Sequence, residues 1–260
     1  MLRIWRNGLR RKQHRRDRLA VELLEDRTLP SFVAAPTYPV GALGHTSGTP
    51  IAVVTGDFNG DGILDVATAN QGSNSISVLF GVGNGTFKPA VTFALGQSPS
   101  ALIAVDLTGD GRLDLVTANK ADNTVSVLLN AGGGKFKPAV TFAAGSGPVA
   151  LAVADFNGDG HVDLGVVDNG AATVTLLMGN GKGSFTSGGT VTVASGSTSI
   201  AVGDFNNSGA PSIATVSGGF GHLDVNLNDG HGNFSAPVNY ATGFCANTVV
   251  VGDFTGNGQP

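Results

Sequence analysis

The chain has 260 residues, of which 41% are hydrophobic and only 13% are charged, and 40 are glycine. This composition excludes a disordered chain, because enough apolar surface is present to bury a core. The glycine content argues against helices and for an all-β fold with many turns. No apolar run approaches the length of a transmembrane helix, so we expect no transmembrane segment.

Residues 1–30 form a basic leader with nine Lys and Arg residues against four acids. The apolar stretch Leu19–Leu24 is too short for a secretory signal and is interrupted by Glu22. Composition alone therefore predicts a solvated tail. Residues 24–30, Leu-Glu-Asp-Arg-Thr-Leu-Pro, resemble a leader found on large bacterial surface proteins, which implies export. Both interpretations stay open at this point.

The body, residues 31–260, carries 15 acids and 6 bases, and every one of these acids is aspartate. Short carboxylates suit tight loops and metal ligation better than helix surfaces. An acidic body also argues against nucleic acid as a partner.

Short β-strands are predicted along the body, rich in Val, Ile, Thr, Ala and Phe and bounded by Gly, Asn, Asp or Pro. Ser31-Phe32 followed by Pro36–Val40 resembles the last strand of a unit. The next unit is predicted to have four strands, at Ile51–Thr55, Asp65–Asn70, Ser75–Phe80 and Phe87–Phe93. No segment sustains a 3.6-residue period, so essentially no helix is expected in the body.

The body repeats every 49 residues, as the first aspartate of one motif shows at Asp57, Asp106, Asp155, Asp204 and Asp253. A phenylalanine after a glycine-rich turn keeps the same step. A four-stranded unit at this period is typical of a β-propeller blade. The units lie near 51–99, 100–148, 149–197 and 198–246, with an incomplete fifth at 247–260.

The motif Asp-Phe-Asn-Gly-Asp-Gly, followed by Asp-Val-Ala, Ser-Val-Leu-Phe-Gly and Gly-Asn-Gly-Thr-Phe, resembles the FG-GAP/VCBS repeat of integrin-α-like propellers. The resemblance covers residues 51–260. It implies a propeller, usually of seven blades, with calcium in the inter-strand loops. It also implies a secreted or cell-surface bacterial scaffold for adhesion, with a protein or a glycan as ligand.

Three loops present oxygen at positions 1, 3, 5 and 9 and a backbone carbonyl at position 7, which is the donor chemistry that Ca²⁺ prefers. A glycine at position 6 permits the sharp turn, and position 2 is an apolar anchor. An EF-hand is excluded because its twelfth-position Glu is missing, whereas a plain turn remains the alternative. The predicted ligands are Asp57, Asn59, Asp61, Ile63 and Asp65; Asp106, Thr108, Asp110, Arg112 and Asp114; and Asp155, Asn157, Asp159, His161 and Asp163.

The fourth loop has Asp204, Asn206, Ser208 and Ser212 at the ligand positions, and Pro211 intrudes. Two carboxylates are therefore missing, and we expect weak or no calcium binding there. Only part of the fifth loop, from Asp253, is present.

No catalytic constellation is visible, so we expect a binding scaffold and not an enzyme. His161 and His231 are interpreted as solvated loop residues. The carboxylates outside the loops fall at or near predicted inter-strand turns and form no recurrent pair: Asp122, Asp168, Asp224 and Asp229. The alternative is the propeller part of a secreted polysaccharide lyase or hydrolase, whose active residues would gather near the axis.

The repeats predict about four blades, a partial segment of a seven-bladed ring. The sequence opens with a fourth strand and stops inside the fifth loop, so it does not supply the strands that close such a ring. Open blades expose an apolar face and an unpaired edge. We therefore expect either that the sequence is truncated or that the chain self-associates through its open edges.

Overall fold

The computed structural model describes residues 36–41, 49–219 and 221–254. The chain divides after Thr37 into two units, and the structure below belongs to the second, Tyr38–Pro260. The predicted leader, the strand start at Ser31-Phe32 and the fifth loop beyond Phe254 lie outside the described residues. Within the described part, no helix is long and apolar enough to cross a membrane.

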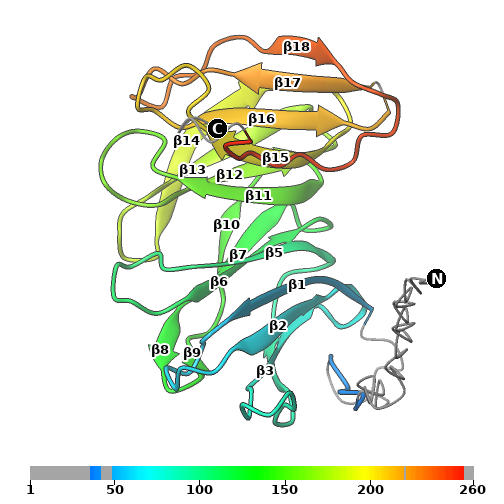
Figure 1. Cartoon of the computed structure of the whole chain (residues 1–260), viewed down its shortest axis with the longest axis vertical. Helices are drawn as coiled ribbons and strands as arrows, with labels where there is room; N and C mark the ends of the chain where they lie inside the picture. The colour runs from blue at the N-terminus through cyan, green and yellow to red at the C-terminus, as the bar shows by residue number, and fades with distance from the viewer. Residues whose placement is uncertain (1–35, 42–48, 220, 255–260) are drawn as a thin grey trace, which may run out of the picture. The chain divides into compact units, whose positions relative to one another are not determined.

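Four antiparallel four-stranded sheets follow one another along the second unit (Figure 1), which confirms the predicted 49-residue blades. In each sheet the strands pair in chain order. Blade 1 contains β1 (Pro50–Gly56), β2 (Asp65–Asn70), β3 (Ser75–Leu79) and β4 (Val91–Ala94). Blade 2 contains β5 (Pro99–Val105), β6 (Asp114–Asn119), β7 (Thr124–Leu128) and β10 (Val140–Ala143). Blade 3 contains β11 (Pro148–Ala154), β12 (Asp163–Asp168), β13 (Thr173–Gly179) and β14 (Phe185–Thr192). Blade 4 contains β15 (Ser197–Gly203), β16 (Ser212–Ser217), β17 (His222–Asn226) and β18 (Val238–Ala241).

Two small elements complete the second unit. The glycine-rich turn of blade 2 is a hairpin of β8 (Asn130–Gly132) and β9 (Lys135–Phe136). A single 3₁₀ turn, Gln71–Ser73, follows β2. The glycine-rich turns thus connect strands, as predicted, and do not open a helix.

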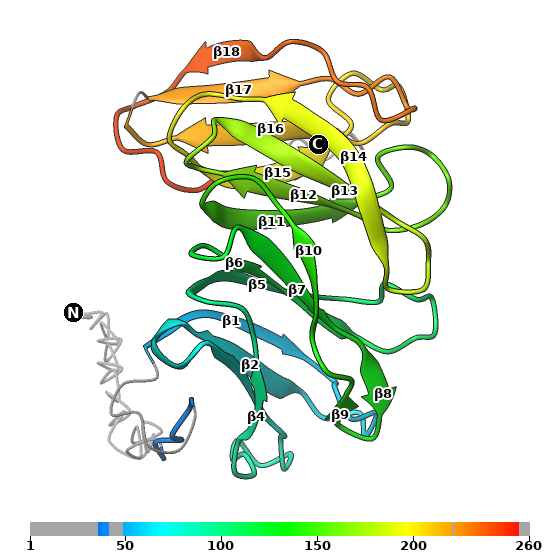
Figure 2. The same ribbon diagram turned by 180° about the vertical axis from the view of Figure 1, so that it is seen from behind.

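The fourth strand of blade 1 begins later than predicted. Phe87 pairs with Gly81 only as an isolated bridge, and β4 starts at Val91. The reason is Pro89, which has no N–H to donate to a ladder. In blade 3 Ser187 stands at the equivalent position, and β14 runs unbroken from Phe185 to Thr192 (Figure 2).

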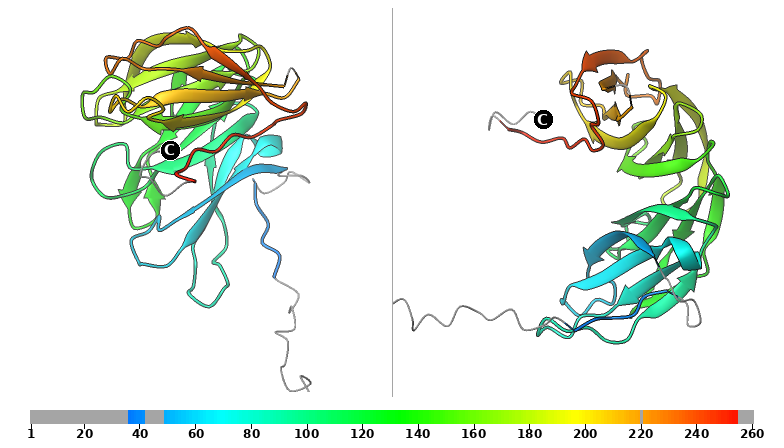
Figure 3. Two further views of the ribbon diagram at one scale, coloured as in Figure 1. Left: turned by 45° about the horizontal axis from the view of Figure 1, so that its top comes forward. Right: turned by 90° about the vertical axis from the view of Figure 1, so that its right-hand side faces the viewer.

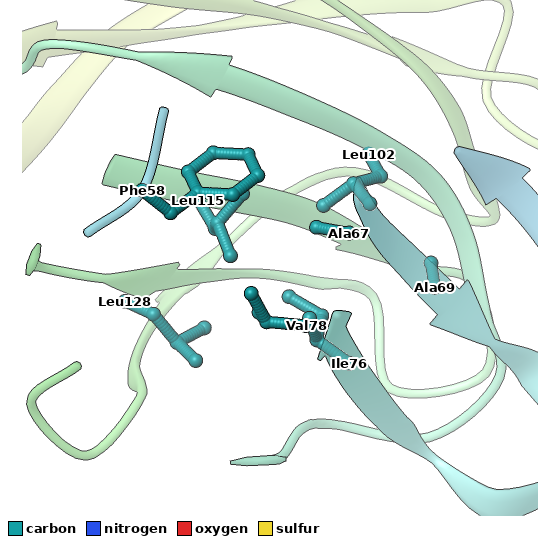
Figure 4. Close-up of a cluster of buried hydrophobic side chains, with 8 residues drawn as sticks. All are labelled: Phe58, Ala67, Ala69, Ile76, Val78, Leu102, Leu115 and Leu128. Atoms are coloured by element: carbon teal, nitrogen blue, oxygen red, sulfur yellow. The ribbon is translucent and has the colours of Figure 1, made fainter. Parts of the chain in front are cut away.

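The hydrophobic core lies between the blades. Its first cluster joins Phe58, Ile76 and Val78 of blade 1 to Leu115 and Leu128 of blade 2 (Figure 4). Equivalent clusters join blade 2 to blade 3 and blade 3 to blade 4. Each blade is therefore stabilised mainly by its neighbours, as in other repeat architectures.

Consecutive blades also contact each other through their first strands, β1, β5, β11 and β15 (Figure 3). The hydroxyl of Ser100 donates to the carbonyl of Pro148 in the next blade at 2.7 Å. The stacking keeps the loops that join first and second strands at one end of every blade.

Candidate calcium-binding loops

The three predicted ligand loops join the first and second strands of blades 1 to 3, at 57–65, 106–114 and 155–163. Positions 4 and 6 of each loop have positive φ, for example +80° at both Gly60 and Gly62. Glycine adopts this conformation without steric cost. The repeated glycines thus let each loop turn back so that its backbone amides reach the first aspartate.

The first aspartate of each loop organises the loop backbone. In loop 1, Asp57 Oδ1 accepts the N–H of Gly60 at 2.7 Å and Oδ2 accepts that of Gly62 at 2.8 Å. Asp106 and Asp155 accept the equivalent amides. The N–H of Gly62 is the largest cause of a pKa of Asp57 below its ordinary value. These backbone bonds therefore favour the ionised carboxylate of Asp57.

The ninth aspartate is buried in all three loops: Asp65, Asp114 and Asp163. Asp65 Oδ2 accepts the N–H of Phe58 at 2.9 Å, and Oδ1 accepts the N–H of Gly81 at 2.8 Å. Loops 2 and 3 repeat both bonds. This residue ties the start of its loop to the segment after the third strand.

The buried carboxylates of loops 2 and 3 are under electrostatic stress. Burial is the largest cause that raises the pKa of Asp114, and the charges of Asp110 and Asp106 raise it further. Burial likewise raises the pKa of Asp163, with Asp159 and Asp155 adding to it. The carboxylates at positions 1, 5 and 9 thus lie within mutual influence, and a divalent cation would relieve their repulsion.

The contacts made at the third, fifth and seventh positions differ between loop 2 and the other two loops. In loop 1, Asn59 Nδ2 donates to Asp61 Oδ2 at 3.0 Å. In loop 2, Arg112 forms an ion pair with Asp110 and donates through Nε to the carbonyl of Asn130 at 3.2 Å. The guanidinium already supplies positive charge to loop 2. Loops 1 and 3 are therefore the better candidates for a cation.

The donor set fits calcium in kind, since each loop offers carboxylate, amide or hydroxyl, and carbonyl oxygens. Its side chains do not converge: among the described residues, no group of three or more His, Cys, Asp or Glu could hold a metal ion. To bind calcium, the carboxylates at loop positions 1 and 5 would have to turn toward the carboxylate at position 9. The ligand assignments stay predictions.

The fourth loop forms the same turn although it lacks two of the three carboxylates. Asp204 accepts the N–H of Gly209 at 2.7 Å, as its counterparts do. Ser212 replaces the buried aspartate and accepts the N–H of Asn228 through its hydroxyl at 3.1 Å. Hydrogen bonds from the backbone amides thus hold this turn together.

Two of the carboxylates predicted at or near turns are buried in strands. Asp168 ends β12 and Asp224 lies inside β17. Asp168 Oδ2 accepts the hydroxyl of Thr175 at 2.6 Å, whereas its buried Oδ1 has no partner. Burial raises the pKa of Asp168. The 49-residue step could have found it, because asparagine occupies the equivalent positions, Asn70 and Asn119.

The remaining polar candidates form no site of their own. His161 and His231 are exposed, as expected for loop residues. Asp122 accepts the N–H of Gln97 in the link between blades 1 and 2. Asp229 caps its own turn through the N–H of His231 at 2.8 Å.

Comparison with known proteins identifies the repeat. The model of the FG-GAP-like repeat matches residues 57–117, 106–166 and 155–215, which together cover more than half of the chain. The chain belongs to the FG-GAP-like repeat family. No match is found among curated proteins.

Several solved structures resemble the FG-GAP-like chain. A lectin from Agrocybe aegerita is 25% identical with a TM-score of 0.49, and the match covers 72% of this chain and 51% of the lectin. A protein from Desulfotomaculum acetoxidans is 15% identical with a TM-score of 0.57, covering 77% and 60%. Virginiamycin B lyase from Staphylococcus aureus is 12% identical with a TM-score of 0.51, covering 78% and 58%. The last two support the propeller-like fold alone, and this chain spans little more than half the length of the three.

Proposed function

We propose that this FG-GAP-like chain is a calcium-binding propeller that acts outside the cell as a scaffold for a protein or glycan ligand. The observation that carries the proposal is the grouping of three carboxylates in one loop: burial raises the pKa values of Asp114 and Asp163, and the charges of the other aspartates in loops 2 and 3 raise them further. FG-GAP repeats often bind Ca²⁺, and calcium would neutralise this charge. Extracellular calcium is abundant enough for weak sites to fill.

The residues that would hold calcium in loop 1 are Asp57, Asn59, Asp61 and Asp65, with the carbonyl of Ile63. Loops 2 and 3 offer the equivalent atoms. Because Arg112 already pairs with Asp110, we expect loop 2 to bind more weakly than loops 1 and 3. In each of these loops, calcium would supply positive charge that holds the carboxylates together. Its role would be structural.

The ligand surface of the proposed scaffold is the end of the blades that carries these loops. A cavity of about 250 Å³ lies between loops 1 and 2, beside Asp57, Arg112 and Asn130. A second of about 360 Å³ lies between loops 3 and 4, beside Asp155 and Asp229. Rigid loops on a scaffold are common sites of recognition. An array of glycans and surface proteins, with and without calcium, would identify the ligand class.

Titration calorimetry with Asp61→Asn tests the calcium sites. Asp61 is exposed, and its Oδ1 accepts the N–H of Ile63. The amide oxygen of asparagine can accept the same bond, so the variant should fold. We expect about one site fewer and a smaller calcium-induced rise in melting temperature. Saturation at one hundred times the dissociation constant stabilises the fold by about 2.7 kcal/mol per site.

The matched control is Asp204→Asn, in the loop that lacks two carboxylates. It should leave the calcium stoichiometry unchanged. No calcium heat, together with no shift of the melting temperature on chelation, would refute the calcium sites.

We further propose that this chain alone has no lyase or hydrolase activity, because no nucleophile–base set or carboxylate pair stands among the described residues outside the loops. A screen of plant, algal and bacterial polysaccharides with calcium should show no turnover. Turnover that survives repurification and is lost on changing Asp122 or Asp229 would favour the enzyme alternative. Protease shaving of intact cells tests the proposed surface location.

A further inference from the structure

One type of interface is repeated three times between consecutive blades. The side of a blade that faces the next blade is its leading face, which carries Ile76, Val125 and Val174 in blades 1 to 3, each 0% exposed. The side that faces the preceding blade is its trailing face. Leu115, Leu164 and Ile213 lie there in blades 2 to 4 and are also 0% exposed.

The leading face of blade 4 has no blade against it among the described residues. Leu223 and Val225 stand where Val174 and Leu176 are buried in blade 3, yet both are only half-buried. Tyr240 in β18 is 53% exposed, whereas its counterpart Val191 is 5% exposed. These residues and Phe205 line an apolar groove of about 420 Å³.

Nothing in the described part of the chain covers the trailing face of blade 1 either. Val53 is 65% exposed, although its counterparts Leu102 and Ile200 are 6% and 9% exposed. Leu64 is 68% exposed, although its counterpart Leu113 packs into the core between blades 1 and 2. The two uncovered faces are thus the two halves of the interface that the chain already forms three times.

We propose that a second copy of this chain docks its blade 1 trailing face onto the blade 4 leading face. This head-to-tail contact continues the internal stacking, and the apolar side chains on both sides match those of the buried copies. Such a contact joins different surfaces on the two copies. It therefore closes a ring or grows into an open chain of copies.

Residues 246–253 lie beside this groove and belong to no strand. Val249 and Val251 line it, and Val249 N–H donates to Ser199 Oγ at 3.3 Å. They occupy the place that the first strand of a docking blade takes, so the second copy must displace them. This segment therefore weakens the association.

Sedimentation velocity of the 260-residue protein over a concentration series tests the contact. The mass should rise above the monomer with concentration. Val53→Asp and Tyr240→Asp each place a charge in the proposed interface and should weaken association more than about tenfold. Val140→Asp is the matched control, because Val140 is 55% exposed on the outer strand of an internal blade. It should associate like the parent chain.

Mixing the two variants decides the geometry. Val53→Asp keeps an intact blade 4 face and Tyr240→Asp keeps an intact blade 1 face, so their mixture should form a 1:1 dimer that grows no further. Circular dichroism shows that each variant is folded. A chain that ends at Ala246 should associate more tightly than the parent. A parent that stays monomeric at every concentration, variants that do not form the mixed dimer, or a truncation that does not strengthen association would overturn the proposal.

Discussion

Replacing Asp168 with asparagine should stabilise this protein. The equivalent Asn119 donates through Nδ2 to the hydroxyls of Thr124 and Ser126, at 3.0 and 2.8 Å. At Asp168 the direction is reversed, because Thr173 and Thr175 donate to the carboxylate. The new amide would form the bonds seen at Asn119 and would remove a buried charge.

The magnitude follows from the charge on the buried, unpaired oxygen. A buried acceptor without a partner costs about 1–3 kcal/mol, and more when it is charged. The amide oxygen would remain unpaired, since Val166 stands where Thr117 donates to Asn119 at 3.2 Å. We therefore expect a gain of about 1–2 kcal/mol at pH 7. For a domain of this size the melting temperature should rise by roughly 2–8 °C.

The pH dependence of this gain tests its cause. The pKa of Asp168 is raised in the folded protein, so its contribution to stability is most favourable below the unfolded pKa and is lost as pH rises through the folded pKa. Asparagine does not titrate. The advantage of the variant should therefore vanish near pH 3 and reach its full size above the raised pKa.

Urea unfolding of Asp168→Asn across this pH range provides the measurement, with Asn119→Asp as the matched reverse change. The reverse variant should lose a similar amount of stability at neutral pH. A variant that is no more stable at pH 7, or a gain that is independent of pH, would refute the explanation by buried charge.

Three further changes test the packing and the loops. Asn130→Ala removes the bonds from Nδ2 to the carbonyls of Phe58 and Leu113, at 2.9 and 3.1 Å, and should cost about 1–3 kcal/mol in urea unfolding; an unchanged midpoint would contradict this. Phe156→Ala should cost about 3–5 kcal/mol, whereas Phe205→Ala, at the same loop position but half-buried, should cost clearly less; equal losses would contradict the inter-blade core. The third test is the pH dependence of the melting temperature in the presence of a chelator. Asp57 and Asp204 have lowered pKa values, so the stability that they contribute is lost as the pH falls through those values. Asp114 and Asp163 have raised pKa values, so the stability that they contribute is lost as the pH rises through those values. The melting temperature should therefore be highest at mildly acidic pH without calcium and shift toward neutral pH with calcium, and an optimum that calcium does not move would contradict this.

The blade and its loop were predictable because each depends on a local pattern repeated at a fixed step. The apolar residue at loop position 2 shows this: Phe58, Leu107 and Phe156 are buried, as predicted. Phe254 at the same position is 84% exposed. Its loop begins with the same Asp-Phe pair, but no neighbouring blade among the described residues packs against it. The sequence predicts the anchor, and the next blade buries it.

Features that depend on partners distant in sequence were not predictable from single residues. A lone aspartate near a predicted turn resembles a turn residue, so the burial of Asp168 and Asp224 was not predicted. The bonds of Asp65 to Phe58 and Gly81 were also missed, because oxygen-bearing spacing suggests a ligand and does not reveal which backbone amide the oxygen accepts. The carboxylate of Asp65 serves the fold through these two bonds.

A second period, twice the first, governs how the blades are tied together. Asn130 and Asn228 stand 98 residues apart, and each donates through Nδ2 to the loop of the preceding blade, at the carbonyls of Phe58 and Phe156. The equivalent positions in blades 1 and 3 are Gly81 and Gly179. A Cβ on either glycine would lie 2.4 or 2.1 Å from the carbonyl oxygen of Leu64 or Val162 in its own blade.

A side chain there would force the backbone apart, so blade 3 cannot form this tie to blade 2 through that position. Loops 1 and 3 are consequently held by a neighbouring blade, and loop 2 is not held in this way. Loop 2, which lacks the tie, is also the loop in which the carboxylate at position 5, Asp110, is paired with Arg112. Alternating ties thus favour firm, charge-rich loops on blades 1 and 3, and these are the loops at which calcium should bind most tightly.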